Sequence, residues 1–457
     1  MKTPKCLNCL VWMLIAVAGF GSVATAASKE KVLYSFQGGT DGATPAGGVV
    51  FDAAGNLYGA TTNGGSASCR SIAQCGTVYQ LAPPAKQGDP WTETVLYVFK
   101  GNASNDGTTP AGGVVMDKAG NLYGTTAYGG TGNCVLLGAK LGCGTVYELS
   151  PPKQKGGAWT ETVLYSFPTA KQGYLPNGDL VLDSAGNLYG ATMFGGGQGT
   201  TCNVLYQYCG AVFELSPPKT KGGKWTEKVL HAFKGGTDGA SPNGGLVFDG
   251  KGAIYGTTLY GGGSSKCKTT YSAGCGTAFK LNPPTVKGGA WTETMLHRFI
   301  EVSGGATPNG GLVFDLRGAL YGTTVGGGNE LGAVFRLLPP AKQGGSWTKT
   351  LVHIFTGVDG AEPMAGLIFD SSGNLYGTTC CDGKPGGGTI FRLRPLAHGA
   401  WALTLLHSFT GAPDGSDPAS SLIFDGTGKL YGTTLLSGNT GQNCGHNGCG
   451  TVFQIQP

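Results

Sequence analysis

Residues 120–126 read GNLYGTT, and residues 373–379 repeat the same seven letters. Close variants begin at Gly55, Gly186, Gly252, Gly318 and Gly428. The motif tyrosines recur every 55 to 66 residues, at Tyr58, Tyr123, Tyr189, Tyr255, Tyr321, Tyr376 and Tyr431. A long, regular period is typical of a repeat architecture, so the 457 residues are read as one array of seven units rather than as separate domains.

Each repeat contains four short apolar runs. In the repeat that spans residues 242–299 they are GLVFD (245–249), AIYGTT (253–258), GTAFKL (276–281) and WTETMLHRF (291–299). The runs are rich in β-branched and aromatic residues, show no helical period and are separated by Gly- and Pro-containing turns. The pattern predicts four antiparallel strands per repeat.

The two ends of the chain indicate how the array closes. Residues 30–36, EKVLYSF, match a fourth strand that lacks the first three, and the last repeat stops after its third strand at residues 450–455. We therefore predict an all-β, seven-bladed β-propeller that is closed when the N-terminal strand completes the last blade. The alternative is a parallel β-helix, whose coils are shorter than a 66-residue period.

The consensus GGLVFD..GNLYGTT..GG....GTVFEL.PP..GG.WTETVLYSF, which recurs over residues 30–457, resembles the GloVer (Gloeo_Verruco) tandem repeat. The resemblance implies an exported bacterial repeat protein, in a family often fitted with alternative surface anchors. It implies no established activity and no catalytic residues.

The N-terminus has the pattern of a secretory signal peptide. Lys2 and Lys5 precede the apolar stretch 9–21, and Ala-Thr-Ala follows at residues 24–26. We expect a signal peptide over residues 1–26 and a propeller over residues 27–457. No later segment is apolar enough to predict a membrane span, so we expect a secreted or periplasmic protein.

Twelve cysteines follow the predicted signal peptide, and they fall in local pairs behind the tyrosine motifs. Local pairing in an exported chain predicts disulfides, whereas two cysteines without a histidine would make a poor zinc site. Adjacent cysteines require a special geometry, so the redox state of the fifth pair below stays open. The pairs are Cys69/Cys75, Cys134/Cys143, Cys202/Cys209, Cys267/Cys275, Cys380/Cys381 and Cys444/Cys449.

The recurring polar residues are interpreted as structural. His231, His297, His353 and His407 share one strand position with tyrosines of other repeats, which indicates packing, and an aspartate before each hairpin indicates turn capping. No hydrolase, metalloprotease or phosphate-binding motif occurs, so we assign no catalytic residue, metal or cofactor. Calcium stays open at the DGxxP segments, which lack dense carboxylates. These begin at Asp41, Asp106, Asp238, Asp359 and Asp414.

Function is sought where the repeats differ. Tyr128, Phe194 and Tyr260 occupy one position in three consecutive repeats, and Asp179 replaces a repeated glycine. Aromatic rings beside a polar group suit a sugar, although the same rings could pack beneath long loops. The remaining ligand-binding candidates are Tyr174, Tyr206, Tyr208 and Tyr271.

Three functions remain open at this point. The first is a non-catalytic, monomeric propeller that binds an extracellular glycan or surface protein. The second is a propeller-type polysaccharide lyase or glycoside hydrolase, for which we expect a non-repeating cluster of acids at the channel mouth. The third is a structural component of an outer layer or matrix. A net charge of +5 without a dense basic helix argues against nucleic acid as a partner.

Overall fold

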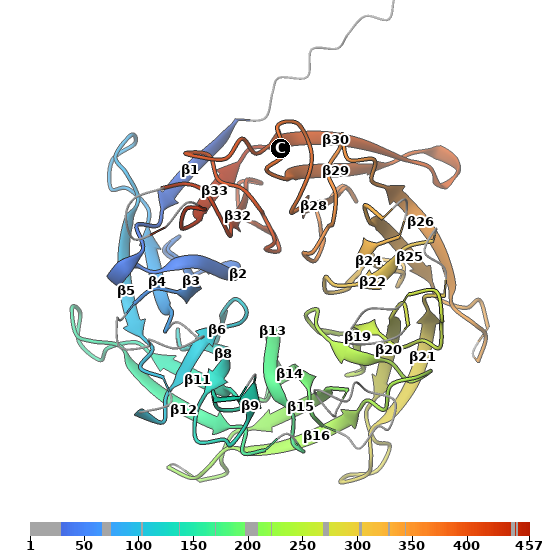
Figure 1. Ribbon diagram of the computed structural model, residues 1–457, viewed down its shortest axis with the longest axis horizontal. Helices are drawn as coiled ribbons and strands as arrows, with labels where there is room; N and C mark the ends of the chain where they lie inside the picture. Colours follow the sequence, from blue (N-terminus) through green and yellow to red (C-terminus); the bar gives the residue numbers. More distant parts are fainter. Residues whose placement is uncertain are drawn as a thin grey trace, which may run out of the picture.

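The computed structural model describes residues 29–457, except 66–74, 102–103, 137, 170, 197–208, 221, 268–273, 301–303, 328–329, 343, 440–443 and 445–446. The predicted signal peptide, residues 1–26, lies outside the described residues. Seven antiparallel sheets are arranged around a central axis (Figure 1), which confirms the predicted seven-bladed β-propeller. Within the described ranges no helix is long and apolar enough to cross a membrane.

Each blade runs from an inner strand at the axis to an outer strand at the wall. Blade one contains β2 (Ala43–Phe51), β3 (Leu57–Asn63), β4 (Thr77–Ala82) and β5 (Thr92–Val98). Blade two contains β6 (Gly107–Pro110), β7 (Val115–Met116), β8 (Leu122–Gly129), β11 (Thr145–Ser150) and β12 (Thr160–Ser166), with the small hairpin β9 (Val135–Leu136) and β10 (Ala139–Lys140) in its cysteine loop. Blade three contains β13 (Tyr174–Leu182), β14 (Leu188–Phe194), β15 (Ala211–Ser216) and β16 (Thr226–Ala232).

The other four blades follow the same plan. Blade four contains β17 (Ala240–Pro242), β18 (Val247–Phe248), β19 (Ile254–Tyr260), β20 (Thr277–Asn282) and β21 (Thr292–Arg298). Blade five contains β22 (Ala306–Pro308), β23 (Val313–Phe314), β24 (Leu320–Gly326), β25 (Ala333–Leu338) and β26 (Thr348–Ile354). Blade six contains β27 (Ile368–Phe369), β28 (Leu375–Thr379), β29 (Thr389–Pro395) and β30 (Trp401–Ser408). Blade seven contains β31 (Ile423–Phe424), β32 (Leu430–Thr434), β33 (Thr451–Ile455) and, as its outer strand, β1 (Glu30–Ser35).

The ring closes in the way that the sequences of the two chain termini predicted. β1 pairs antiparallel with β33, with Glu30 opposite Ile455 and Ser35 opposite Thr451 (Figure 1). At the axis, blade seven also contacts blade one, where the Thr433 hydroxyl donates to the carbonyl of Gly47, 3.0 Å away. Closure leaves no blade with an unpaired third strand, so the sheet edge that an open array would expose is covered.

The repeated motif is explained by the contacts of its copy in blade two. Asp117 accepts hydrogen bonds from the backbone amide of Asn121 (2.9 Å) and from the hydroxyl of Tyr123 (3.1 Å), which confirms the predicted turn capping. Gly120 has φ +85°, which the hairpin turn requires, and a Cβ on Gly124 would lie 2.3 Å from the hydroxyl oxygen of the buried Tyr147. These contacts constrain nearly every position of the motif.

The hydrophobic core lies between neighbouring blades. A phenylalanine at the end of each outer strand is fully buried and meets, edge to face, an aromatic ring on the third strand of the next blade. Phe36 packs on Tyr79 in this way, with ring centroids 5.0 Å apart, and Phe233 packs on Phe279 at 5.1 Å. The buried set is Phe36, Phe99, Phe167, Phe233, Phe299, Phe355 and Phe409. Each blade therefore completes the core of its neighbour, as stacked repeats require.

Candidate functional site

Two kinds of loop meet at one end of the ring. The loop that enters each blade contacts the loop between its second and third strands. The amide of Gly65 donates to the carbonyl of Gly39 at 2.6 Å, and that of Gly130 donates to Asp106 at 2.8 Å. We call this end the cysteine-loop face, because the second-to-third-strand loops carry the cysteines.

Disulfides hold these loops. Cys134–Cys143, Cys267–Cys275, Cys380–Cys381 and Cys444–Cys449 are bonded. Cys75 and Cys209 are also disulfide-bonded, and their predicted partners Cys69 and Cys202 lie outside the described residues. The bonds Cys134–Cys143, Cys267–Cys275 and Cys444–Cys449 confirm the predicted local pairing. The state of the adjacent pair was left open by the sequence, and Cys380 and Cys381 are bonded.

Seven equivalent residues, one from each blade, form a ring on this face, and we call the area that they enclose the mouth. Each member precedes the proline that leads into the inner strand of its blade and has a positive φ between 52° and 61°. In most blades its amide donates to the backbone of the preceding cysteine loop, as Thr44 does to Cys449 at 2.7 Å. Positive φ is costly for such residues, so the inter-blade bond helps to hold it. This pre-proline ring consists of Thr44, Thr109, Leu175, Ser241, Thr307, Glu362 and Asp417.

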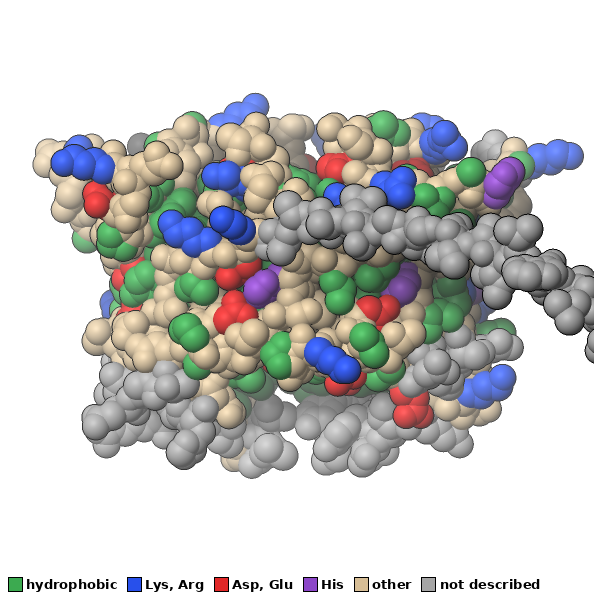
Figure 2. All heavy atoms as spheres, turned by 90° about the horizontal axis from the view of Figure 1, so that it is seen from above, with side chains coloured by type: hydrophobic (Ala, Val, Ile, Leu, Met, Phe, Trp, Pro, Cys, Tyr) green, Lys and Arg blue, Asp and Glu red, His purple; other side chains and the backbone are tan. Residues whose placement is uncertain are grey.

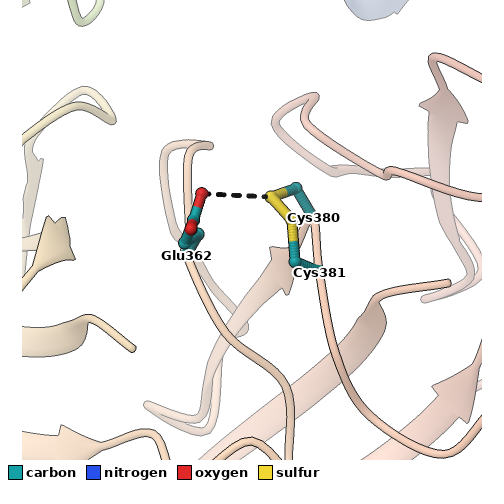
Figure 3. Close-up of side chains that lie close together, drawn as sticks. All are labelled: Glu362, Cys380 and Cys381. Carbon is teal, nitrogen blue, oxygen red and sulfur yellow. Dashed lines mark hydrogen bonds between the residues drawn. A yellow bond between two sulfur atoms is a disulfide. The ribbon is translucent and has the colours of Figure 1, made fainter. Parts of the chain in front are cut away.

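Two adjacent members of the pre-proline ring are acidic, Glu362 in blade six and Asp417 in blade seven. Burial, and then the charge of Glu362, raises the pKa of Asp417. The Glu362 carboxylate Oε2 also lies 3.9 Å from the Sγ of Cys380 (Figure 3). Because a disulfide sulfur carries no proton, that approach is a contact rather than a hydrogen bond. One end of the mouth therefore presents two carboxyl groups beside a disulfide.

Backbone bonds fix this acidic end in place. The Ala361 amide donates to the carbonyl of Cys381 at 2.9 Å, and the Glu362 amide donates to Leu331 of blade five at 2.9 Å. The Asp417 amide donates to Gly387 of blade six at 2.9 Å. The two acids are thus placed by contacts that cross blade boundaries.

The predicted aromatic arc lies at the ends of strands β8, β14 and β19. Tyr128, Phe194 and Tyr260 are half-buried there, in three consecutive blades. Phe194 is the register partner of Tyr174 in the neighbouring strand, and the two rings lie 5.5 Å apart. Phe194 and Tyr260 also pack against the cores of their blades, so part of each ring has a structural role. The candidates Tyr206, Tyr208 and Tyr271 lie outside the described residues.

Asp179 lies on the inner strand β13, at the channel. Its Oδ1 accepts a hydrogen bond from the amide of Gly113 in blade two at 2.7 Å, and burial raises its pKa. Side-chain hydrogen bonds also link the asparagines at one inner-strand position of blades three to five, from Asn177 to Asn243 and from Asn243 to Asn309. Asp179 therefore joins two blades within a polar channel wall and does not stand alone at the mouth.

Glu362 and Asp417 were not among the site residues predicted from the sequence. A repeat-by-repeat comparison of the residue before the proline that leads into each inner strand would have found them, because the other five positions carry threonine, serine or leucine. That comparison gains meaning only once the position is known to line the mouth.

Solved structures with a similar arrangement include the PQQ-bound form of aldose sugar dehydrogenase from Streptomyces coelicolor. The two sequences are 14% identical, the match covers 94% of this chain and 98% of the dehydrogenase chain, and the TM-score is 0.44. Another is Pseudomonas fluorescens PhoX in complex with vanadate, with 11% identity, 94% and 95% coverage, and a TM-score of 0.43. Among curated proteins none matches the sequence. The pattern of the Gloeobacter/Verrucomicrobia repeat matches three times, over residues 19–204, 134–344 and 267–457. These overlapping matches span nearly the whole chain, and the protein belongs to this repeat family.

Proposed function

We propose that the protein is exported and binds an extracellular glycan at the mouth of its cysteine-loop face without transforming it. The observation that carries the proposal is the division of that mouth into two unlike ends. Blades two to four contribute Tyr128, Phe194 and Tyr260, and blades six and seven contribute Glu362 and Asp417. The disulfides of the same face support export, since such bonds persist in oxidising compartments.

The two ends lie on opposite sides of the axis. In Figure 1, β14 of blade three lies across the ring from β28 and β32 of blades six and seven. A sugar chain offers apolar C–H faces that stack on aromatic rings and hydroxyl groups that donate to carboxylates. A glycan that spans the mouth would meet both kinds of group. Loops held by disulfides would also reduce the entropy lost on binding.

A glycoside hydrolase is the second candidate, and the acid pair favours it. Burial and a neighbouring charge raise the pKa of Asp417. Glycosidases use one protonated and one ionised carboxyl group, and such a shift separates two acids in this way. The alternative therefore assigns proton donation to Asp417 and the ionised role to Glu362.

The decisive experiment is a screen of the purified mature protein against glycans and polysaccharides, with mass detection of products. For a bound glycan, we expect E362Q/D417N and Y128A to weaken affinity at least tenfold without a matching loss of thermal stability. K287A is the control and should bind normally, because Lys287 lies in the loop between β20 and β21, which is not one of the loops of the cysteine-loop face. Product formation that E362Q abolishes would replace the binding role with the hydrolase. The absence of any glycan ligand, or binding that both mouth variants leave unchanged, would refute the proposal.

A further inference from the structure

A triplet of equivalent residues recurs where neighbouring blades meet on the outer wall. Its first member is a Tyr or His on the outer strand of one blade. Its second member lies in the loop that follows, four positions before the proline, and its third member lies on the outer strand of the next blade. All of these residues lie within the described part of the chain. The seven triplets are Tyr34/Asp41/Glu93, Tyr97/Asp106/Glu161, Tyr165/Gln172/Glu227, His231/Asp238/Glu293, His297/Gly304/Lys349, His353/Asp359/Leu403 and His407/Asp414/Glu30.

The first two members are hydrogen-bonded in four of the seven triplets, those of Tyr34, Tyr97, His353 and His407. The Tyr97 hydroxyl donates to Asp106 at 2.8 Å, and His353 Nε2 lies 2.8 Å from the Oδ2 of Asp359. The predicted packing position is therefore also a polar one. Figure 2 shows histidine side chains beside acidic ones halfway up the outer wall.

The residue type of the third member varies with that of the second. Where Gly304 replaces the aspartate, the glutamate is replaced by Lys349, whose ammonium group donates to the carbonyl of Gly304. Where the aspartate is present, the third member is a glutamate in four of five triplets, which places two carboxyl groups together. Two adjacent carboxylates repel each other unless a proton or a cation lies between them.

Two triplets combine both acids with a histidine. In each, His231/Asp238/Glu293 and His407/Asp414/Glu30, one ligand atom from every residue lies within 4.8 Å of the other two. An imidazole nitrogen with two carboxylate oxygens is a donor set that zinc accepts, with water as the fourth ligand. The partial exposure of His407 and Asp414, at 20% and 13% of their side chains, leaves room for that water.

Buried donor atoms without partners provide a second observation. Among the described residues, His231 Nε2 is buried and makes no hydrogen bond. The Oε1 atoms of all five triplet glutamates, Glu293 and Glu30 among them, are also buried and unpartnered. His231 Nε2 lies 3.5 Å from Asp238 Oδ2, too far for a good hydrogen bond but close to the separation of two ligands around one ion. A buried polar atom without a partner is costly, and a metal ion in each of the two histidine triplets would satisfy the unpartnered atoms of that triplet.

We infer that the junctions between blades three and four and between blades six and seven each bind a zinc ion, through His231, Asp238 and Glu293 and through His407, Asp414 and Glu30. The second ion would bridge the closing strand β1 to blade six, because Glu30 is the first residue of β1. Both ions would have structural roles, since they lie on the wall and away from the mouth.

The chain supplies matched variants for the test. Tyrosine occupies the histidine position in three triplets, so His231→Tyr and His407→Tyr introduce a residue that this fold already accommodates. His353→Tyr is the control, because its triplet has Leu403 in place of the glutamate. Tyr97→His completes a third triplet, with Asp106 and Glu161 already in place.

Purified protein is loaded with Zn²⁺, passed through a desalting column and measured by mass spectrometry of the bound metal, with melting temperature as the second readout. We expect two ions per chain in the wild type and in H353Y, one in H231Y or H407Y, none in the double variant, and three in Y97H. A chelator should lower the melting temperature of the wild type but not that of the double variant. No zinc in the wild type, equal loss in H353Y, or no gain in Y97H would overturn the assignment.

Discussion

Val32, near the start of the described chain, is the register partner of Phe453 in the last blade. This pair joins the first and last strands of the propeller, so the stability of the whole ring depends on a segment that begins immediately after residue 29. The adjoining side chains Leu33 and Phe36 are buried in the core between blades seven and one.

Deletion of residues 30–36 should therefore destabilise the entire propeller. It removes the outer strand of blade seven and exposes the edge of β33. We expect a lower melting temperature and aggregation, measured by differential scanning fluorimetry and light scattering. F36A alone should cost about 3–5 kcal/mol of unfolding free energy, as for other large-to-small changes at buried aromatics.

A synthetic peptide of residues 29–37, added to the deleted protein, provides the control. It should pair with β33 and restore much of the lost melting temperature. A deletion variant that melts like the wild type would show that the other six blades are stable without closure.

The thiol content should match the observed disulfides. Ten cysteines of the described chain are bonded, and Cys75 and Cys209 require partners outside it, for which the sequence offers Cys69 and Cys202. Mature protein unfolded without reductant should therefore show no free thiol in a colorimetric assay. Two thiols would indicate that Cys380 and Cys381 are reduced in solution. Six or more would contradict the disulfide assignment of the loops.

The fold was predictable because the same pattern of strands and turns recurs in all seven repeats. The hairpin at Asp117 and the closing strand at Glu30 follow local patterns that every repeat reinforces, so chance matches are averaged out. The acidic pair was not predictable in the same way. Glu362 and Asp417 are ordinary residues within their own repeats, and they become neighbours only through the ring geometry.

The polar contacts of the outer wall escaped prediction for a related reason. The aspartate of one triplet and its glutamate come from consecutive repeats, and no local pattern connects them. The shared Tyr/His position correctly indicated a structural role, but its hydrogen bond to the loop aspartate required the three-dimensional arrangement. The contact between Tyr174 and Phe194 likewise depends on the register of two strands.

The outer-wall glutamates should make the stability depend on pH. Burial, and then the charge of Asp41, raises the pKa of Glu93 to about 8, from 4.5 for a free glutamate. Burial and the charge of Asp106 raise that of Glu161 to about 7. Between pH 4.5, the pKa of a free glutamate, and these raised pKa values, the folded protein thus binds more protons than the unfolded chain. By linkage, its stability falls as the pH rises from about 5 to about 8.

Glu93→Gln tests this relationship at a junction with tyrosine in place of histidine, where no zinc is expected. The neutral amide avoids the repulsion from Asp41 at every pH. We expect E93Q to melt at a higher temperature than the wild type at pH 8, to match it near pH 5, and to show a flatter profile between them.

The control is Glu227→Gln. Its triplet contains Gln172 in place of the aspartate, and burial alone raises the pKa of Glu227 to about 7, against a hydrogen bond from Tyr165 that lowers it. E227Q should therefore change the profile less than E93Q, and the difference between the two variants measures the effect of the neighbouring carboxylate. Melting profiles of E93Q and the wild type that stay parallel from pH 5 to pH 8 would show that Glu93 is ionised throughout, and that its junction accommodates two negative charges without a proton between them.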